Sequence, residues 1–395
     1  MKRIAARFVY PLDSYDPVYE GYVEVDDEGT IVSVGKCDDF LSEKNIWDGA
    51  IIPGMVNAHC HVELSHLKGK FRKGSGMAGF IDQINALRDS SSRDEKIRRL
   101  SSEMDRMWKS GVSAMADISN CDDSFAVKAA SPMYTRTFLE VFGSEPQDCA
   151  AVIEGAKALK KEAESYGLDA SITPHACYTM SPQLVTASAA EGLSTGYLSY
   201  HSQESRQEEE MIASGTGEMA ENRRRYGMSM PPVTGKSSLD YFIGRLLQVH
   251  PAPFDEHILL VHNVCLDETA AEAALSVMKN VFWAVCPLSN IFIHDTLPPV
   301  MLMRKLGLSI CVGTDSLSSN YDLDMVKEMY CLQKNFPEVK TGEILSWACL
   351  NGARFLSREE TLGSIAPGKR PGIVGIRDVD RNGALTASSC SVRLV

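Results

Sequence analysis

The sequence has no long hydrophobic run, no paired cysteine motif and no excess of basic charge. No stretch approaches the roughly 20 apolar residues of a membrane helix, and residues 1–17 lack the apolar segment of a signal peptide. The 395 residues include 40 lysines and arginines against 52 aspartates and glutamates, which argues against nucleic acid or anionic lipid as a main partner. We therefore expect a cytoplasmic protein with neither a nucleic-acid nor a membrane partner.

The 11 cysteines give no sign of a disulfide framework. They are scattered from Cys37 to Cys390, and no two of them form a CxxC pair. An odd, unpatterned set of this kind is typical of reduced thiols in the cytosol. Hydrophobic residues make up 44% of the chain and charged residues 23%, so the sequence predicts a folded protein with a sizeable core.

Short apolar runs divide the chain into three parts. Residues 1–52 predict short strands with a hairpin, and residues 356–395 return to short β segments. In residues 53–355, eight short apolar runs alternate with helical patterns, as expected for βαβ units around a parallel sheet. The sequence therefore predicts an α/β fold: a (β/α)₈ barrel with a small β-sandwich domain formed from both chain ends.

Several predicted helices carry recognisable end signals. A helix over 95–110 precedes Gly111, and a helix over 150–166 precedes Gly167, the glycine position that commonly ends a helix. Ser181 followed by Pro182 predicts the start of another helix, with serine as the N-cap.

The first chemical signal is the segment PGMVNAHCHVELSH, in which His59 and His61 are two residues apart. On a strand, residues i and i+2 point to the same face, so both imidazoles can reach one ion. Taken alone the pair is a weak signal, because a histidine at a strand end is often simply hydrogen-bonded.

Three further strand ends carry similar side chains. His201 ends the run STGYLSYHS with Glu204 three residues on, His262 ends HILLVH, and Asp315 follows LSICVG. Catalytic residues of barrels of this kind come from the carboxyl ends of several strands and face one pocket. Imidazoles and a carboxylate suit zinc or iron, with a coordination position left for water.

The order HxH, HxxE, a lone histidine and GTDS resembles the amidohydrolase superfamily, and within it the deaminase and chlorohydrolase branch. The resemblance covers nearly the whole chain and includes the segments PGMVNAH, TPHACYTMSP, CPLSN, EILSWACLNGARFL and LGSIAPGK. It departs from the family at Cys60, where threonine is commoner, and at GKRPGIVGI near the end of the chain. The motifs are specific for the superfamily and less so for a substrate.

The resemblance implies a single divalent metal ion, with zinc favoured and iron or nickel as alternatives. Many amidohydrolases hold two metals bridged by a modified lysine on the fourth strand. Here that strand is ASITPHACY, and no lysine occurs between Lys161 and Lys236. The implied metal ligands are His59, His61, His201 and Asp315.

The resemblance also implies the catalytic groups. Asp315 would touch the metal and take the proton of the attacking water, and His262 would orient the water or polarise the tetrahedral centre. Glu204 would be the proton shuttle, although a solvated charge is the alternative because glutamates 208–210 follow closely. Only Glu204 falls at the HxxE position.

Substrate contacts are expected from three residues. HxELS, LEVFG, HSQES, CPLSN and TDSLSSN are most similar to enzymes that deaminate aminodeoxyfutalosine, a 6-aminopurine nucleoside of menaquinone biosynthesis. The resemblance implies that Glu63 accepts bonds from a ribose hydroxyl, and that His175 and Ser316 contact the substrate. The structural alternatives are a Glu63 carboxylate bonded to backbone and a His175 ring that fixes a loop.

Three functions follow as competing hypotheses. The first is a hydrolytic deaminase that releases ammonia from a 6-aminopurine nucleoside (aminodeoxyfutalosine, adenosine, methylthioadenosine or adenosylhomocysteine). The resemblance also implies that the chain can form a homodimer. The second is a chlorohydrolase or a cyclic amide or imidazolone hydrolase with the same metal set. The third, a non-catalytic barrel scaffold, predicts a missing ligand, and none is missing.

Overall fold

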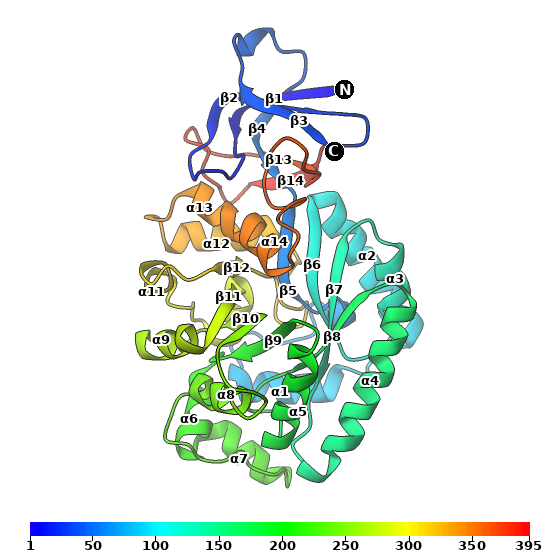
Figure 1. Cartoon of the computed structure of the whole chain (residues 1–395), viewed down its shortest axis with the longest axis vertical. Coiled ribbons are helices and arrows are strands. Elements are labelled where there is room, and N and C mark those ends of the chain that lie inside the picture. Colours follow the sequence, from blue (N-terminus) through cyan, green and yellow to red (C-terminus); the bar gives the residue numbers. More distant parts are fainter.

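The computed structural model describes all residues 1–395, and parallel strands form its centre (Figure 1). Eight of them make two four-stranded parallel sheets, in the orders β5-β6-β7-β8 and β12-β11-β10-β9. Their bounds are Met55–Cys60 (β5), Val112–Ser119 (β6), Tyr134–Val141 (β7), Asp169–Pro174 (β8), Tyr197–Ser202 (β9), Phe254–His262 (β10), Met278–Val285 (β11) and Ile310–Val312 (β12). The predicted α/β fold with parallel strands is confirmed.

The two sheets adjoin at both edges through a few hydrogen bonds. Between β5 and β12, the backbone N–H groups of Thr314 and Asp315 both donate to the His59 carbonyl at 3.0 Å. Between β8 and β9, the His201 N–H donates to the His175 carbonyl at 2.9 Å. This order of strands is consistent with the predicted barrel, but no continuous ladder closes the two seams.

Helices follow the strands and have the ends expected from the sequence. Gly111 ends α2 with φ 104, in the left-handed region that favours glycine. Ser181 caps α5 by accepting a bond from the Leu184 N–H. The longer helices are α1 (Gly76–Leu87), α2 (Arg93–Ser110), α4 (Cys149–Ser165), α5 (Pro182–Leu193), α6 (Arg206–Ser214), α7 (Gly217–Arg225), α8 (Ser238–Leu246), α9 (Glu268–Val277), α10 (Pro287–His294) and α12 (Met325–Asn335). The shorter ones are α3 (Phe125–Ala130), α11 (Val300–Lys305), α13 (Thr341–Ser346) and α14 (Gly352–Phe355).

Strands from both chain ends share a separate six-stranded sheet, which lies at one end of the molecule with both termini (Figure 1). Its order is β14-β13-β4-β1-β2-β3, and β13 pairs with β4 in antiparallel register. The bounds are Lys2–Val9 (β1), Val18–Val25 (β2), Ile31–Lys36 (β3), Ile46–Pro53 (β4), Ile373–Arg377 (β13) and Cys390–Arg393 (β14). The pairing of the chain ends is thus seen, whereas a sandwich of two facing sheets is not confirmed.

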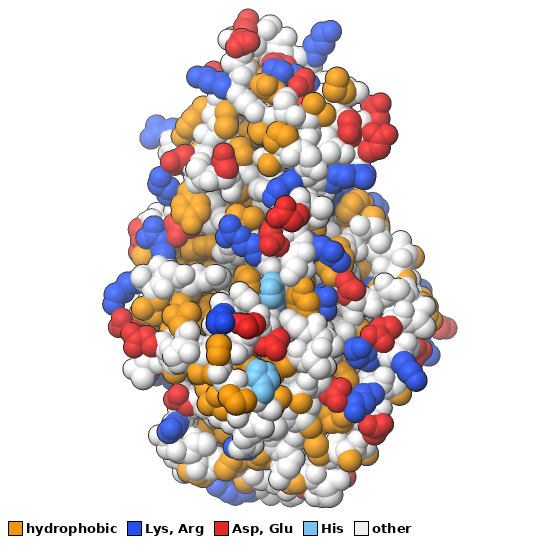
Figure 2. All heavy atoms as spheres, viewed as in Figure 1, with side chains coloured by type: hydrophobic (Ala, Val, Ile, Leu, Met, Phe, Trp, Pro, Cys, Tyr) orange, Lys and Arg blue, Asp and Glu red, His pale blue; other side chains and the backbone are white.

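The strands are buried on both faces, as parallel strands covered by helices require. Every residue of β5 and β6 is buried, although β5 carries the polar Asn57 and His59. No helix is long and apolar enough to cross a bilayer. On the face shown in Figure 2, charged side chains of both signs are interspersed.

Candidate metal centre and active site

Side chains from the first and last strands of the central sheets converge on one point. The Nε2 atoms of His59 and His61 lie 3.1 Å apart. Asp315 follows β12 and places Oδ1 3.6 Å from His59 Nε2 and 3.4 Å from His61 Nε2. All three side chains are buried, so these polar atoms meet away from bulk water.

This donor set fits a single metal ion. Ligand atoms about 2.1 Å from a tetrahedral metal lie roughly 3.4 Å from one another, close to the observed separations. His201 comes from the neighbouring half of the fold, and its Nδ1 lies 3.2 Å from the His175 carbonyl oxygen. A protonated Nδ1 donates a hydrogen bond to that carbonyl oxygen, which leaves Nε2 free to bind a metal.

Burial keeps the His61 and His201 imidazoles neutral, which is the form that binds a metal. Burial, together with the neighbouring His59 ring, lowers the pKa of His61 to about 4. Burial and the surrounding imidazoles hold the pKa of His201 well below its ordinary value. Little proton release is therefore needed when a cation binds at neutral pH.

Asp315 is held in its ionised form by its neighbours. Burial opposes its ionisation, but the hydrogen bond with His59 and the nearby imidazoles outweigh burial and hold its pKa well below the ordinary value. The Ser289 and Ser319 hydroxyls both donate to Oδ2 at 2.6 Å. Since Oδ2 is occupied in this way, Oδ1 is the oxygen that faces the histidines.

Glu204 and His262 form the second half of the site. The Tyr178 hydroxyl donates to Glu204 Oε2 at 2.6 Å, and Glu204 Oε1 lies 3.4 Å from His262 Nε2. On the far side of the imidazole, the Asn290 amide donates to His262 Nδ1 at 3.1 Å. In this arrangement Nε2 carries the proton and faces Glu204.

The protonation of this pair is set by burial. Burial raises the pKa of Glu204 well above its ordinary value, although the Tyr178 hydrogen bond opposes the shift. Burial lowers the pKa of His262 to about 3. Burial therefore favours the protonated form of Glu204, a carboxylic acid able to give a proton, and the neutral form of the His262 imidazole.

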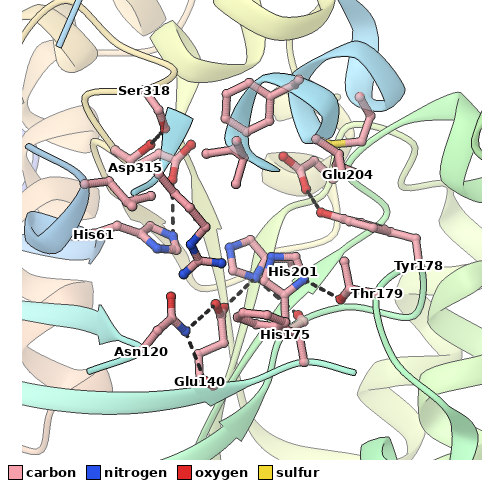
Figure 3. Close-up of a pocket in the computed structure, with 18 of the residues that line it drawn as sticks. His61, Asn120, Glu140, His175, Tyr178, Thr179, His201, Glu204, Asp315 and Ser318 are labelled. Carbon is pink, nitrogen blue, oxygen red and sulfur yellow. Dashed lines mark hydrogen bonds and ion pairs between the residues drawn. The ribbon is translucent and has the colours of Figure 1, made fainter. Parts of the chain in front are cut away.

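A cavity of about 140 Å³ opens onto these groups (Figure 3). Glu204, His201 and Asp315 point into it from opposite sides. The lining includes most of the residues predicted from the sequence: His61, His175, His201, Glu204, His262, Asp315 and Ser316.

Glu63 is not among the residues that line this cavity. Its two oxygens accept bonds from the Asn120 N–H at 2.9 Å and the Ser124 hydroxyl at 3.0 Å. Beside it, Lys128 and Asp117 form a fully buried ion pair at 2.6 Å. Glu63 thus occupies the position expected from the structural alternative, and its role toward a ribose hydroxyl stays a prediction without support from this geometry.

Sequence reasoning missed three residues of the cavity. Glu140 lies on β7 in the motif LEVFG, with Oε1 3.4 Å from His201 Nδ1 and no hydrogen-bond partner for that oxygen. Tyr178 lies in TPHACYTMSP, and Arg88 directly follows α1. Two of these residues sit inside motifs that the sequence already singled out, whereas nothing in the sequence marked Arg88.

The chain is similar to known proteins over most of its length. Residues 50–392 match the Amidohydrolase family. An adenosine deaminase of Helicobacter pylori is 27% identical over 386 residues, which cover 93% of this chain and 90% of the relative. A 5-methylthioadenosine/S-adenosylhomocysteine deaminase of Moorella thermoacetica is 26% identical, over 83% of this chain and 73% of the relative.

Solved structures share the fold over nearly all of the chain. Helicobacter pylori aminofutalosine deaminase in complex with methylthio-coformycin gives a TM-score of 0.79 at 23% identity, covering 96% of this chain and 93% of the other. A zinc-bound adenosine deaminase from Xanthomonas campestris gives 0.71 at 21% identity, covering 95% and 84%.

The resemblance drawn from the motifs is therefore confirmed at the level of the family. The family match and the deaminase relatives also confirm the prediction of a hydrolytic enzyme acting on non-peptide C–N bonds. Members of the family bind a divalent metal, which agrees with the convergent histidine and aspartate side chains. With 343 of its residues matched (50 to 392), this chain belongs to the Amidohydrolase family.

Proposed function

We propose that the protein is a hydrolytic deaminase of a 6-aminopurine nucleoside and that it works with one divalent metal. The observation that carries the proposal is the buried carboxyl group of Glu204, which faces the same cavity as the candidate metal ligands and accepts a hydrogen bond from Tyr178. Deamination of a ring needs such an acid, because the ring nitrogen must gain a proton as water adds to the neighbouring carbon. The curated relatives, which include deaminases of adenosine and methylthioadenosine, support the same class of substrate.

Each residue has a separate task in this scheme. A metal bound by His59, His61, His201 and Asp315 would lower the pKa of water from 15.7 to about 7. Asp315 accepts a proton from the water, because its own low pKa keeps it ionised until then. Glu204 would donate its proton to the ring nitrogen, then take the proton of the new hydroxyl group and pass it to the departing amino group, which leaves as ammonia. The proton held by Asp315 would then return to Glu204, while His262 orients the new oxygen through Nε2.

We also propose that Glu140 binds the sugar hydroxyls, the role that the sequence suggested for Glu63. Its Oε1 is buried and without a hydrogen-bond partner, and the side chain lines the cavity. Burial raises the pKa of Glu140 to about 8, so the side chain is largely protonated at neutral pH. A carboxylic acid both donates and accepts, as a pair of adjacent hydroxyls requires.

Replacing Glu140 by alanine is expected to raise KM for adenosine by about 10-fold or more, because one or two hydrogen bonds to the sugar are lost. With 2′,3′-dideoxyadenosine, which lacks the hydroxyls, wild type and variant should have similar KM values. The matched variant Glu140→Gln keeps a neutral donor and acceptor, so its KM for adenosine should stay near that of wild type. Equal losses with both nucleosides would show that Glu140 acts through His201 rather than through the sugar.

The proposed function is tested by ammonia release from a panel of 6-aminopurine nucleosides. The panel contains aminodeoxyfutalosine, adenosine, methylthioadenosine and S-adenosylhomocysteine, each with zinc-loaded protein. Turnover of one or more of them at kcat/KM in the usual range of about 10⁴ M⁻¹s⁻¹ or above supports the proposal. Silence across the panel, with one metal bound per chain, contradicts it and leaves the chlorohydrolase and cyclic amide or imidazolone hydrolase alternatives.

A further inference from the structure

Arg88 is a cation in the active-site cavity that has no partner in the protein. It directly follows α1, and its guanidinium takes part in no hydrogen bond or ion pair. The backbone, in contrast, is fixed at both ends of the residue. Its N–H donates to the Ile84 carbonyl at 2.9 Å, and its carbonyl oxygen lies 2.9 Å from His66 Nε2.

The carboxylate that shares the cavity does not neutralise this cation. Glu140 lies close enough for Arg88 to influence its pKa, but the two side chains form no ion pair. Glu140 Oε2 is instead held by the Asn120 side-chain amide at 3.3 Å. Because the two side chains form no ion pair and Glu140 Oε2 is bonded to Asn120, the planar fork of guanidinium donors on Arg88 remains available to an anion.

Apolar side chains lie on one side of Arg88. Its Cζ lies 5.3 Å from the centre of the Phe142 ring, and Phe142 is 41% exposed, a large aromatic surface beside the cavity. A second hollow of about 350 Å³ shares Arg88, Glu140 and Phe142 with the central cavity. The rest of its lining is mainly apolar side chains, including Leu139, Val152, Ala156 and Leu159.

We infer that Arg88 and Phe142 form an outer subsite for a substrate arm that is apolar and ends in a carboxylate. A guanidinium binds a carboxylate through two parallel hydrogen bonds, and an aromatic ring buries the apolar part of the arm. A phosphate attached directly to the sugar lacks the apolar arm and would leave Phe142 and the second hollow uncovered. This inference rests on the proposed nucleoside deamination, because the base and sugar must fill the inner cavity.

A matched pair of substrates isolates the subsite: a 5′-carboxyalkylthioadenosine and its methyl ester, which differ only in charge. For wild type, kcat/KM should favour the acid over the ester. In Arg88→Met the acid-to-ester ratio should fall by about 10- to 100-fold, the size of a hydrogen-bonded charge pair. The ratio for Arg88→Lys should lie between those of wild type and Arg88→Met, because lysine keeps the charge but lacks the planar fork of donors. Arg99→Met, on the exposed face of α2, serves as the matched control and should leave the ratio unchanged.

Calorimetric binding to the zinc-loaded Glu204→Gln protein tests the same subsite without turnover. The acid should bind more tightly than the ester, and Arg88→Met in that background should remove the difference. An acid-to-ester ratio that is the same with and without Arg88 overturns the subsite, even when methylthioadenosine is deaminated. If Arg88→Met lowers kcat/KM for adenosine monophosphate as much as for the acid, the subsite does not require an apolar arm, and that part of the inference is overturned. Binding of the acid through Arg88, together with no turnover of any nucleoside, would instead support the subsite and reject the proposed function.

Discussion

Replacement of Glu204 by glutamine is expected to lower kcat by about 10²- to 10⁴-fold, the usual contribution of a positioned general acid. Glutamine has nearly the same shape, and it can still accept a bond from Tyr178, so folding and metal binding should survive. What is lost is the proton that burial holds on Glu204. Ammonia release, metal content and the unfolding temperature, measured on the same preparation, separate loss of chemistry from loss of structure.

The pH profile provides a second measurement of the same group. Glu204 acts as an acid, so activity should fall as pH rises through its raised pKa, because the proton is then lost. The Tyr178 hydroxyl favours the ionised form and holds that pKa down. Tyr178→Phe should therefore move the alkaline limb to higher pH, with a smaller effect on kcat than Glu204→Gln. An alkaline limb that does not move, or Glu204→Gln at wild-type rates, would refute the shuttle role.

The positions of the metal ligands could be predicted because they follow from short-range geometry. His59 lies on β5 and His61 directly after it, and the alternation of side chains brings them to one side. Asp315 follows a parallel strand whose carboxyl end must lie beside that of β5. The glycine of GTDS also has a physical explanation, because a Cβ on Gly313 would lie 2.7 Å from the His59 carbonyl oxygen.

Strand alternation does not continue as far as Glu63. It would place Glu63 on the face of His61, but the chain turns into a 3₁₀ helix over Val62–Leu67 directly after His61. The side chain therefore follows helical rather than strand geometry and reaches Ser124 instead of the cavity. No breaker residue in HVELSH marks this turn at the strand end, so it could not be predicted from the sequence.

Long-range contacts and backbone strain could not be predicted from the sequence either. Tyr178 meets Glu204 across 26 residues, through the packing of the segment between β8 and α5. His262 and Asp315 have φ values of 75 and 55, in the left-handed region that residues other than glycine rarely adopt. Strain of this kind costs about 1–3 kcal/mol per residue and is common at functional sites, where the surrounding packing holds it in place.

Removing the metal should abolish activity, and the variants should show which histidines bind it. Chelation is expected to lower the rate by roughly 10⁴-fold or more, because bulk water has a pKa of 15.7 whereas water on zinc has a pKa near 7. One equivalent of zinc per chain should restore the rate. A second equivalent should add nothing, since no lysine lines the cavity to bridge two metals.

His61→Ala and His262→Ala form the matched comparison, because both rings are buried and both lie near His59. His262 Nδ1 is occupied by Asn290, and its Nε2 faces Glu204. The His262 variant should therefore keep one zinc and lose turnover, whereas the His61 variant should lose the zinc. Zinc at 1,000 times its Kd stabilises the folded state by about 4 kcal/mol, so only the His262 variant should gain several degrees in Tm on addition of zinc. If the His262 variant loses the zinc and the His61 variant keeps it, His262 is a ligand in place of His61. Its imidazole would then not be available to act beside Glu204.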